Sequence, residues 1–200
     1  TLLDEAILSS RVVINQYPNS RFVEDAYYII SISMFLKEDY KGAQNHLNKL
    51  IDLFPNGKSK VEAYLWLSYC ELKLDNSNNS QKILNKTIVE NKLNKDESYL
   101  SNIIFAELFL ERGEFSNAYE KYKEAIEYSS TDVEKIKIYN QLIKISDKNE
   151  DYINLVEFLD DIYPFLRTIK EKKEIKLLSI KYNKELENFE YVILEIEEML

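Results

Sequence analysis

Apolar residues recur along this chain at the spacing of one face of a helix. Tyr27, Ile30, Ser31 and Met34 stand at i, i+3, i+4 and i+7, and the same spacing returns from Tyr64. A period of this kind is typical of an α-helix that buries one side. The pattern predicts helices over about 2–17, 21–37, 40–54, 59–75, 79–92, 96–112, 115–129, 132–148, 151–163, 168–186 and 188–200.

One position repeats through the whole chain at a nearly constant interval. Successive copies are 37 residues apart, with a single step of 38, at Ala6, Ala43, Ser80, Ala118, Leu155 and Val192. The first four copies are small residues, which two helices need where they come into close contact. A bulky residue follows most of the copies one turn later. A repeat of this length predicts a solenoid in which each helix pair packs only on its neighbours.

Two stretches carry a recognisable motif. The segment LFLERGEFSNAYEKYKEAI, from Leu108 to Ile126, has a helix, a turn with glycine and a helix with Ala-x3-Tyr-x2-Ala. It resembles a tetratricopeptide repeat (TPR), and so does FLKEDYKGAQNHLNKLIDLFP, which ends at Pro55. The usual TPR period is about 34 residues, so the helices or the joints are longer here. The joints YPNSRFVEDAYY and FPNGKSKVEAYL are similar to those of bacterial envelope TPR proteins, the β-barrel assembly lipoprotein and the Tol–Pal-associated type.

The resemblance implies an all-α, right-handed superhelical solenoid of antiparallel helix pairs. We expect residues 1–200 to form a single domain, with a leading half repeat followed by five pairs. Because the chain starts without a methionine and stops inside an amphipathic stretch, we expect it to be a fragment of a longer protein. The run DNSNNS at Asp75–Ser80 predicts a polar connection between helices.

In a TPR array the first helix of each pair lines a concave groove. The residues that the resemblance places there in the first three pairs include Tyr28, Ile32, Phe35, Trp66, Tyr69 and Glu107. This stripe is apolar for a surface in water. It has two interpretations: core packing, or a hydrophobic groove that takes a peptide or helix with Trp66 and Tyr69 as anchors.

The fourth pair presents a different face. Lys137, Asn140, Gln141, Lys144 and Lys148 stand at i, i+3, i+4, i+7 and i+11, and Lys181 lies one repeat after Lys144. This face is either solvated or a basic groove that orients an acidic group or a carboxylate end of a ligand.

Composition excludes several kinds of function. The 26 basic and 35 acidic residues give a net charge of −9, which disfavours non-specific nucleic-acid binding. One cysteine and one histidine exclude a disulfide framework and a Cys/His zinc site, and we interpret Cys70 as a buried structural residue. No nucleotide-binding, hydrolase or metalloprotease motif is present. We therefore expect no enzyme activity, no cofactor and no metal, and no stretch of about 20 apolar residues predicts a membrane span.

These observations predict a non-catalytic scaffold that binds a protein or peptide, with envelope assembly as the more specific hypothesis. The alternative is a regulatory or structural segment of a larger enzyme or signalling protein. An RNA-processing repeat is a third hypothesis, and self-association through an apolar end is a fourth. The sequence leaves the compartment open between the periplasm or cell envelope and the cytoplasm.

Overall fold

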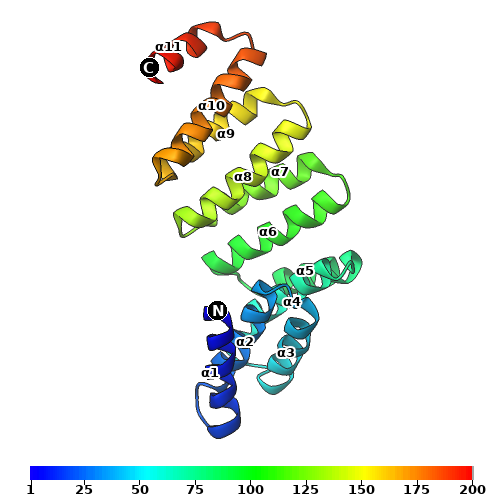
Figure 1. The fold of residues 1–200 in the computed structure, drawn as a ribbon. Helices are drawn as coiled ribbons and strands as arrows, with labels where there is room; N and C mark the ends of the chain where they lie inside the picture. Colours follow the sequence, from blue (N-terminus) through cyan, green and yellow to red (C-terminus); the bar gives the residue numbers. More distant parts are fainter. Residues whose placement is uncertain (200) are drawn as a thin grey trace. The chain divides into compact units, whose positions relative to one another are not determined.

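The computed structural model describes residues 1–199, with side-chain surroundings as far as residue 197. This part of the chain holds α-helices and one short 3₁₀ helix, and no strand (Figure 1). The helices are α1 (Leu2–Gln16), α2 (Val23–Leu36), α3 (Tyr40–Leu53), α4 (Lys60–Lys73), α5 (Ser77–Glu90), α6 (Lys95–Glu111), α7 (Phe115–Tyr128), α8 (Asp132–Lys148), α9 (Tyr152–Ile162), η1 (Tyr163–Phe165), α10 (Ile169–Glu185) and α11 (Phe189–Met199).

The chain divides into two compact units, Thr1–Leu108 and Phe109–Leu200. In the first unit α1 packs on α2, α2 on α3, α3 on α4 and α4 on α5. In the second unit α7 packs on α8, α8 on α9, α9 on α10 and α10 on α11. The all-α fold of consecutive antiparallel helix pairs is thereby confirmed. That residues 1–200 behave as a single domain stays a prediction.

One expected loop is partly helical. The sequence predicts a connection at Asp75–Ser80, but α5 already begins at Ser77. Asn76 is the N-cap of α5, and its side chain makes no capping hydrogen bond. Packing recruits this segment instead, because the Ser68 hydroxyl donates to the Ser80 carbonyl oxygen at 2.9 Å.

The repeated small position is where paired helices meet. Ala43, Ser80 and Ala118 are 0 % exposed, and so is Leu155 in the fourth pair. The bulky residue one turn later is also buried, at Leu47, Leu84, Tyr122 and Leu159. A small side chain lets the two helix backbones approach, and the next bulky one fills the space beside the contact.

The turn inside each pair has the same backbone geometry. A residue just past the first helix is left-handed in every pair, at Glu38, Asp75, Gly113, Glu150 and Glu187. The following N–H bonds back to a carbonyl five residues earlier at 2.9–3.0 Å, as from Asp39 to Met34. This arrangement satisfies the free carbonyls at the helix end. Glycine adopts it without strain, whereas other L-residues do so at a cost.

Gly113→Ala should therefore lower the free energy of unfolding by about 1 kcal/mol. A Cβ at Gly113 would meet nothing within 4 Å, so the cost comes from the backbone (φ 73°) alone. Urea unfolding followed by circular dichroism measures it. Ser116→Ala, an exposed helical position nearby, is the matched control and should change the free energy by less than about 0.5 kcal/mol. Equal stability of the two variants would contradict the strain argument.

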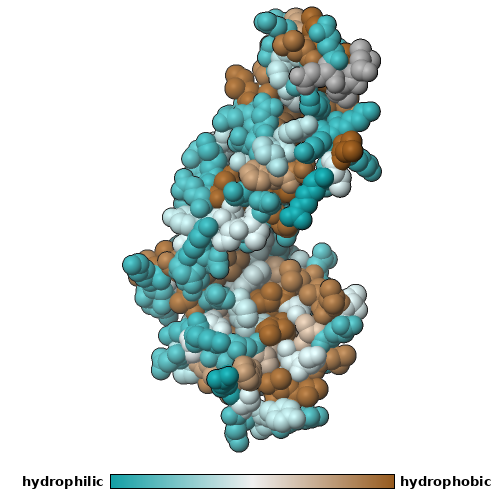
Figure 2. Space-filling view, turned by 90° about the vertical axis from the view of Figure 1, so that its left-hand side faces the viewer, coloured by the Kyte–Doolittle hydropathy of each residue, from teal (hydrophilic) through white to brown (hydrophobic). Residues whose placement is uncertain are grey.

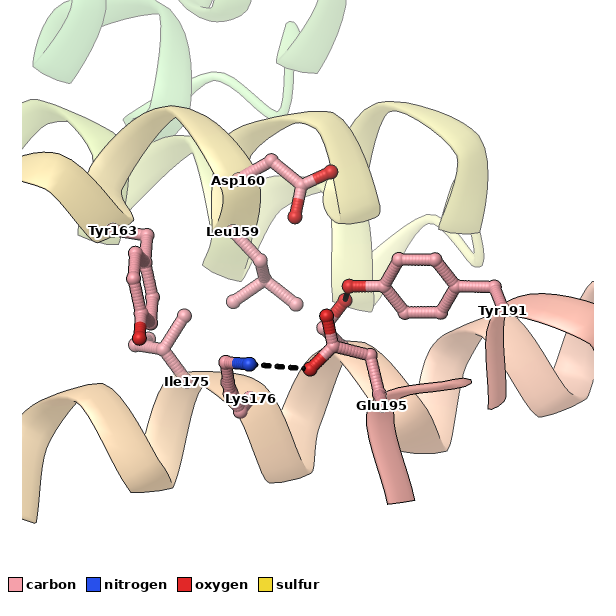
Figure 3. Close-up of a pocket in the computed structure, with 8 residues that line it drawn as sticks. Leu159, Asp160, Tyr163, Ile175, Lys176, Tyr191 and Glu195 are labelled. Atoms are coloured by element: carbon pink, nitrogen blue, oxygen red, sulfur yellow. Dashed lines mark hydrogen bonds and ion pairs between the residues drawn. The ribbon is translucent and has the colours of Figure 1, made fainter. Parts of the chain in front are cut away.

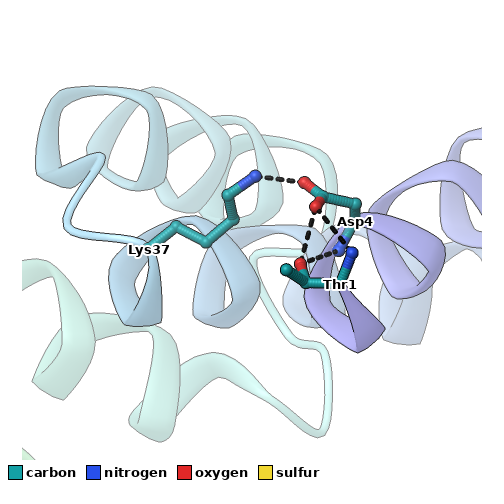
Figure 4. Close-up of polar contacts among 3 residues, drawn as sticks. All are labelled: Thr1, Asp4 and Lys37. Atoms are coloured by element: carbon teal, nitrogen blue, oxygen red, sulfur yellow. Dashed lines mark hydrogen bonds and ion pairs between the residues drawn. The ribbon is translucent and has the colours of Figure 1, made fainter.

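The start of α1 is joined to the end of α2 by a polar cluster (Figure 4). Thr1 caps α1: its hydroxyl accepts from the Asp4 N–H at 3.3 Å and donates to the Asp4 carboxylate at 2.6 Å. The Lys37 ammonium forms an ion pair with the other Asp4 oxygen. Lys37, followed by Thr1, holds the pKa of Asp4 well below its ordinary value of 3.8.

A lowered pKa means that folding favours the ionised form of Asp4. The resulting stabilisation is fully present above the pKa of the unfolded chain, and it is lost as the pH falls through the pKa of the folded chain. We expect the Asp4 carboxyl to stay ionised as the pH drops below 3.8 in an NMR titration. Lys37→Ala should raise its pKa, whereas Lys58→Ala, which removes a different exposed partner of a carboxylate (Asp25), should leave it unchanged. An unchanged Asp4 titration in Lys37→Ala would refute the assignment.

Candidate protein-binding surface

Polar side chains connect the first helices of neighbouring pairs in the N-terminal unit. Tyr28 of α2 lies close to Glu62 and Trp66, both of α4. Burial, and then the nearby Glu62 carboxylate, raise the pKa of Tyr28 well above its ordinary value. On α4, Tyr69 donates to the Glu107 carboxylate of α6, and Lys73 forms an ion pair with it. The same faces of α2, α4 and α6 are thus held side by side.

Aromatic rings form the centre of this surface. The Phe35 ring centroid lies 4.9 Å from that of Trp66 and 4.7 Å from that of Tyr69. Trp66 and Tyr69 stack with centroids 6.0 Å apart. Phe35 is buried, at 9 % exposed, while Trp66 and Tyr69 are partly buried. The buried ring therefore orients two rings that keep part of their surface open.

An exposed apolar stripe lies on α2 beside these rings. Ile29 and Leu36 share a face with Tyr28 and Ile32 by helical spacing, and they are 42 % and 57 % exposed. Tyr28 and Ile32 are partly buried. On the face drawn in Figure 2, apolar residues gather over the N-terminal unit, while hydrophilic ones predominate over the C-terminal unit. Leu36 is not among the site residues that the sequence predicts, because the helical spacing that places it on this face does not show whether a neighbour covers it.

The C-terminal unit carries the predicted basic face. Four of the α8 residues, Lys137, Asn140, Lys144 and Lys148, are exposed, and Gln141 is partly buried. The Lys148 ammonium lies 4.7 Å from the centroid of the Phe115 ring, which lines a cavity of about 310 Å³ at the start of α7 and α9.

Lys181, on α10, is also exposed and donates to the Tyr182 hydroxyl at 3.2 Å. The Tyr182 hydroxyl in turn donates to Asp147 of α8 at 2.6 Å. This bond joins α8 and α10, the first helices of two successive pairs.

Equivalent positions in successive repeats show how this surface changes along the chain. One position of the first helix is occupied in successive pairs by Ile32, Tyr69, Glu107, Lys144 and Lys181. The first three are partly buried, and the two lysines are exposed. The same structural position is thus apolar, then aromatic, then acidic and finally basic. The two units therefore carry different side-chain chemistry at this position.

Cys70 is the one cysteine of the chain, and it is buried. Burial raises the pKa of the Cys70 thiol to about 12, so it is a poor nucleophile. Among residues 1–199 no group of three or more His, Cys, Asp or Glu side chains is placed to hold a metal ion. None of the helices in that range is both long and apolar enough to span a bilayer.

Comparison with known proteins identifies the repeat. Residues 25–57, which take in most of α2 and all of α3, match the family model described as tetratricopeptide repeat. The chain carries the TPR fold. A search of curated proteins finds no match. TPR helix pairs are typical of scaffolds that bind other proteins.

Solved structures support the same fold over most of the chain. BtubC (BKLC) from P. vanneervenii is 12 % identical with a TM-score of 0.66, covering 98 % of this chain and 86 % of that one. PilF of Pseudomonas aeruginosa is 12 % identical with a TM-score of 0.64, covering 96 % and 81 %. MamA from Desulfovibrio magneticus RS-1 is 16 % identical with a TM-score of 0.54, covering 82 % and 85 %. At such identities the likeness concerns the fold alone, and a role in envelope assembly stays a prediction.

Proposed function

We propose that this TPR chain is a scaffold that holds a partner polypeptide against the exposed faces of its first helices. The observation that supports this most is the apolar stripe of α2, Ile29 and Leu36, beside the partly buried Trp66 and Tyr69. Water-facing positions of a helix surface are usually polar, and apolar patches of this kind mark contact surfaces.

The geometry suits a peptide or an amphipathic helix. Aromatic side chains contribute most to interfaces when they are held in place before binding, because less conformational entropy is then lost. Here Phe35 packs against Trp66 and Tyr69, and Glu107 accepts from the Tyr69 hydroxyl. Apolar residues of a partner at i, i+3 and i+4 match such a surface. Trp66 and Tyr69 both pack against Phe35, and the Lys73 ammonium lies 5.1 Å from the Tyr69 ring centroid. The part of each ring that stays exposed is what a partner would contact.

The basic face of α8 and α10 supports a second contact in the same partner or in another one. Lys137, Lys144 and Lys181 are exposed and can pair with carboxylates. In a chain of net charge −9, such a face gives orientation and association rate more than affinity.

Affinity capture with residues 1–200 as bait tests the apolar contact. Ile29→Lys should reduce partner capture at least about tenfold, because it places a charge in an apolar interface. Leu53→Lys is the matched control: Leu53 is 56 % exposed, on the second helix α3, and the same substitution should leave capture intact.

Circular dichroism should show both variants folded, since both positions already face water. Partner capture that survives Ile29→Lys, or that Leu53→Lys reduces equally, would place the contact elsewhere.

The basic contact predicts a salt dependence. Lys137→Glu with Lys144→Glu should slow association with the captured partner several-fold at about 50 mM salt and much less at about 200 mM, where charges are screened more strongly. Surface plasmon resonance measures both rates. The matched control is Lys49→Glu with Lys82→Glu, two exposed lysines on second helices with the same change of charge. If both pairs slow association alike, only the net charge matters, and the basic face has no specific role.

A further inference from the structure

A cavity of about 250 Å³ lies among α9, α10 and α11 in the C-terminal unit (Figure 3). Its floor is apolar, formed by Leu159, which is 0 % exposed, and by Ile175. The remaining walls carry polar or charged groups: Asp160, Tyr163, Lys176, Ser179, Tyr191 and Glu195. An apolar floor with a few convergent polar groups is the usual make-up of a binding pocket.

The preceding repeat shows why the space is open. There the rings of Tyr139 and Phe158 pack with centroids 6.3 Å apart, and both side chains are buried. One period of 37 residues later the same positions hold Lys176 and Glu195. These two form an ion pair, with the Lys176 nitrogen 2.8 Å from a Glu195 carboxylate oxygen. Two aromatic rings thus give way to two narrower polar side chains at the edge of the cavity.

The charges around the cavity do not cancel. Lys176 pairs with Glu195, whereas no hydrogen bond or ion pair in the described part of the chain involves the Asp160 carboxylate. Burial, then the negative charges of Glu195 and Asp161, raise the pKa of Asp160 above its ordinary value. The Asp160 side chain is exposed at the edge of the cavity, so water solvates its carboxylate, and a bound cation would add a direct charge-assisted hydrogen bond.

The aromatic walls favour the same kind of ligand. Tyr163 and Tyr191 stand on opposite sides of the cavity, and Figure 3 shows the Asp160 carboxylate between them. The Lys172 ammonium lies 5.4 Å from the Tyr163 ring centroid, so a cation of the chain itself already stands over one face of this ring. Cations bind favourably over the faces of tyrosine rings, and a carboxylate adds a charge-assisted hydrogen bond.

We propose that this cavity receives the ammonium or guanidinium group of a lysine or arginine side chain from a partner protein. The aliphatic stem lies on Leu159 and Ile175, and the charged end pairs with Asp160 between Tyr163 and Tyr191. The inference rests on the proposed scaffold function, because a protein partner carries the cation. It adds a second contact that is separate in the chain from the α2 stripe.

An NMR titration of the full chain tests the cavity without knowledge of the partner. The probes are Nα-acetyl-lysine methylamide, Nα-acetyl-arginine methylamide and free cadaverine, with Nε-acetylated lysine as the uncharged control. We expect saturable millimolar shifts of the amides of Tyr163, Ile175 and Tyr191 with the charged probes and none with the acetylated one. Stronger binding of cadaverine than of the amino-acid probes would point to a free polyamine rather than a partner side chain, and would overturn the proposed source.

Two variants keep the test decisive. Asp160→Asn should weaken binding at least about tenfold, while Glu157→Gln, one turn earlier on α9 and outside the cavity, should leave it unchanged. Lys176→Tyr with Glu195→Phe restores the rings of the preceding repeat and should abolish the shifts by filling the space. Binding that persists in Asp160→Asn, or that the acetylated probe matches, would overturn the proposal. If partner capture depends on Ile29 but no probe binds, the proposed cation site is refuted and the scaffold function still holds.

Discussion

The close approach of two helices at one small residue is the contact on which the rest of the fold depends. Ala43, Ser80 and Ala118 are fully buried at equivalent places, and a bulky side chain one turn later fills the adjoining space. Close packing tolerates little change of volume, so this contact sets how each pair is assembled. The left-handed residue in each turn then returns the second helix against the first, with its N–H and C=O groups satisfied at the helix end. Within each unit, neighbouring pairs stack through the faces that remain.

This way of packing leaves one side of every first helix outside the core, and that side is where the repeats differ. The position that is Ile32 in the first pair becomes Tyr69, Glu107, Lys144 and Lys181 in the later ones. In the N-terminal unit, hydrogen bonds between neighbouring first helices fix the aromatic side chains, as from Tyr69 to Glu107. In the C-terminal unit the equivalent residues are exposed lysines. A common scaffold therefore presents two different chemistries without a change of fold.

The last repeats depart from this packing rule, and the departure opens a space between helices. Leu155 takes the place of the small residue and is still fully buried, so the surrounding side chains accommodate its larger volume. One repeat later an ion pair, Lys176 with Glu195, stands where Tyr139 and Phe158 pack ring against ring. Polar side chains fill less of the space between helices than aromatic ones do. The cavity of about 250 Å³ lies beside the repeat positions where this ion pair replaces the two rings.

The amino-acid sequence by itself determined the helices, their pairing and the period, because these depend on local spacing and on the residue types that two helices need in order to touch. It also placed Trp66, Tyr69 and Lys144 on the first-helix face. The tertiary structure alone decided how much of each side chain stays open, since exposure depends on neighbours distant in the sequence: Phe35 is buried while Ile29 is 42 % exposed. It also showed that DNSNNS enters a helix, because the bond from Ser68 to Ser80 is made only after α4 and α5 pack. The cavity beside Asp160 was also decided by the tertiary structure, because helical spacing gives the faces of α9, α10 and α11 but not the volume left between them.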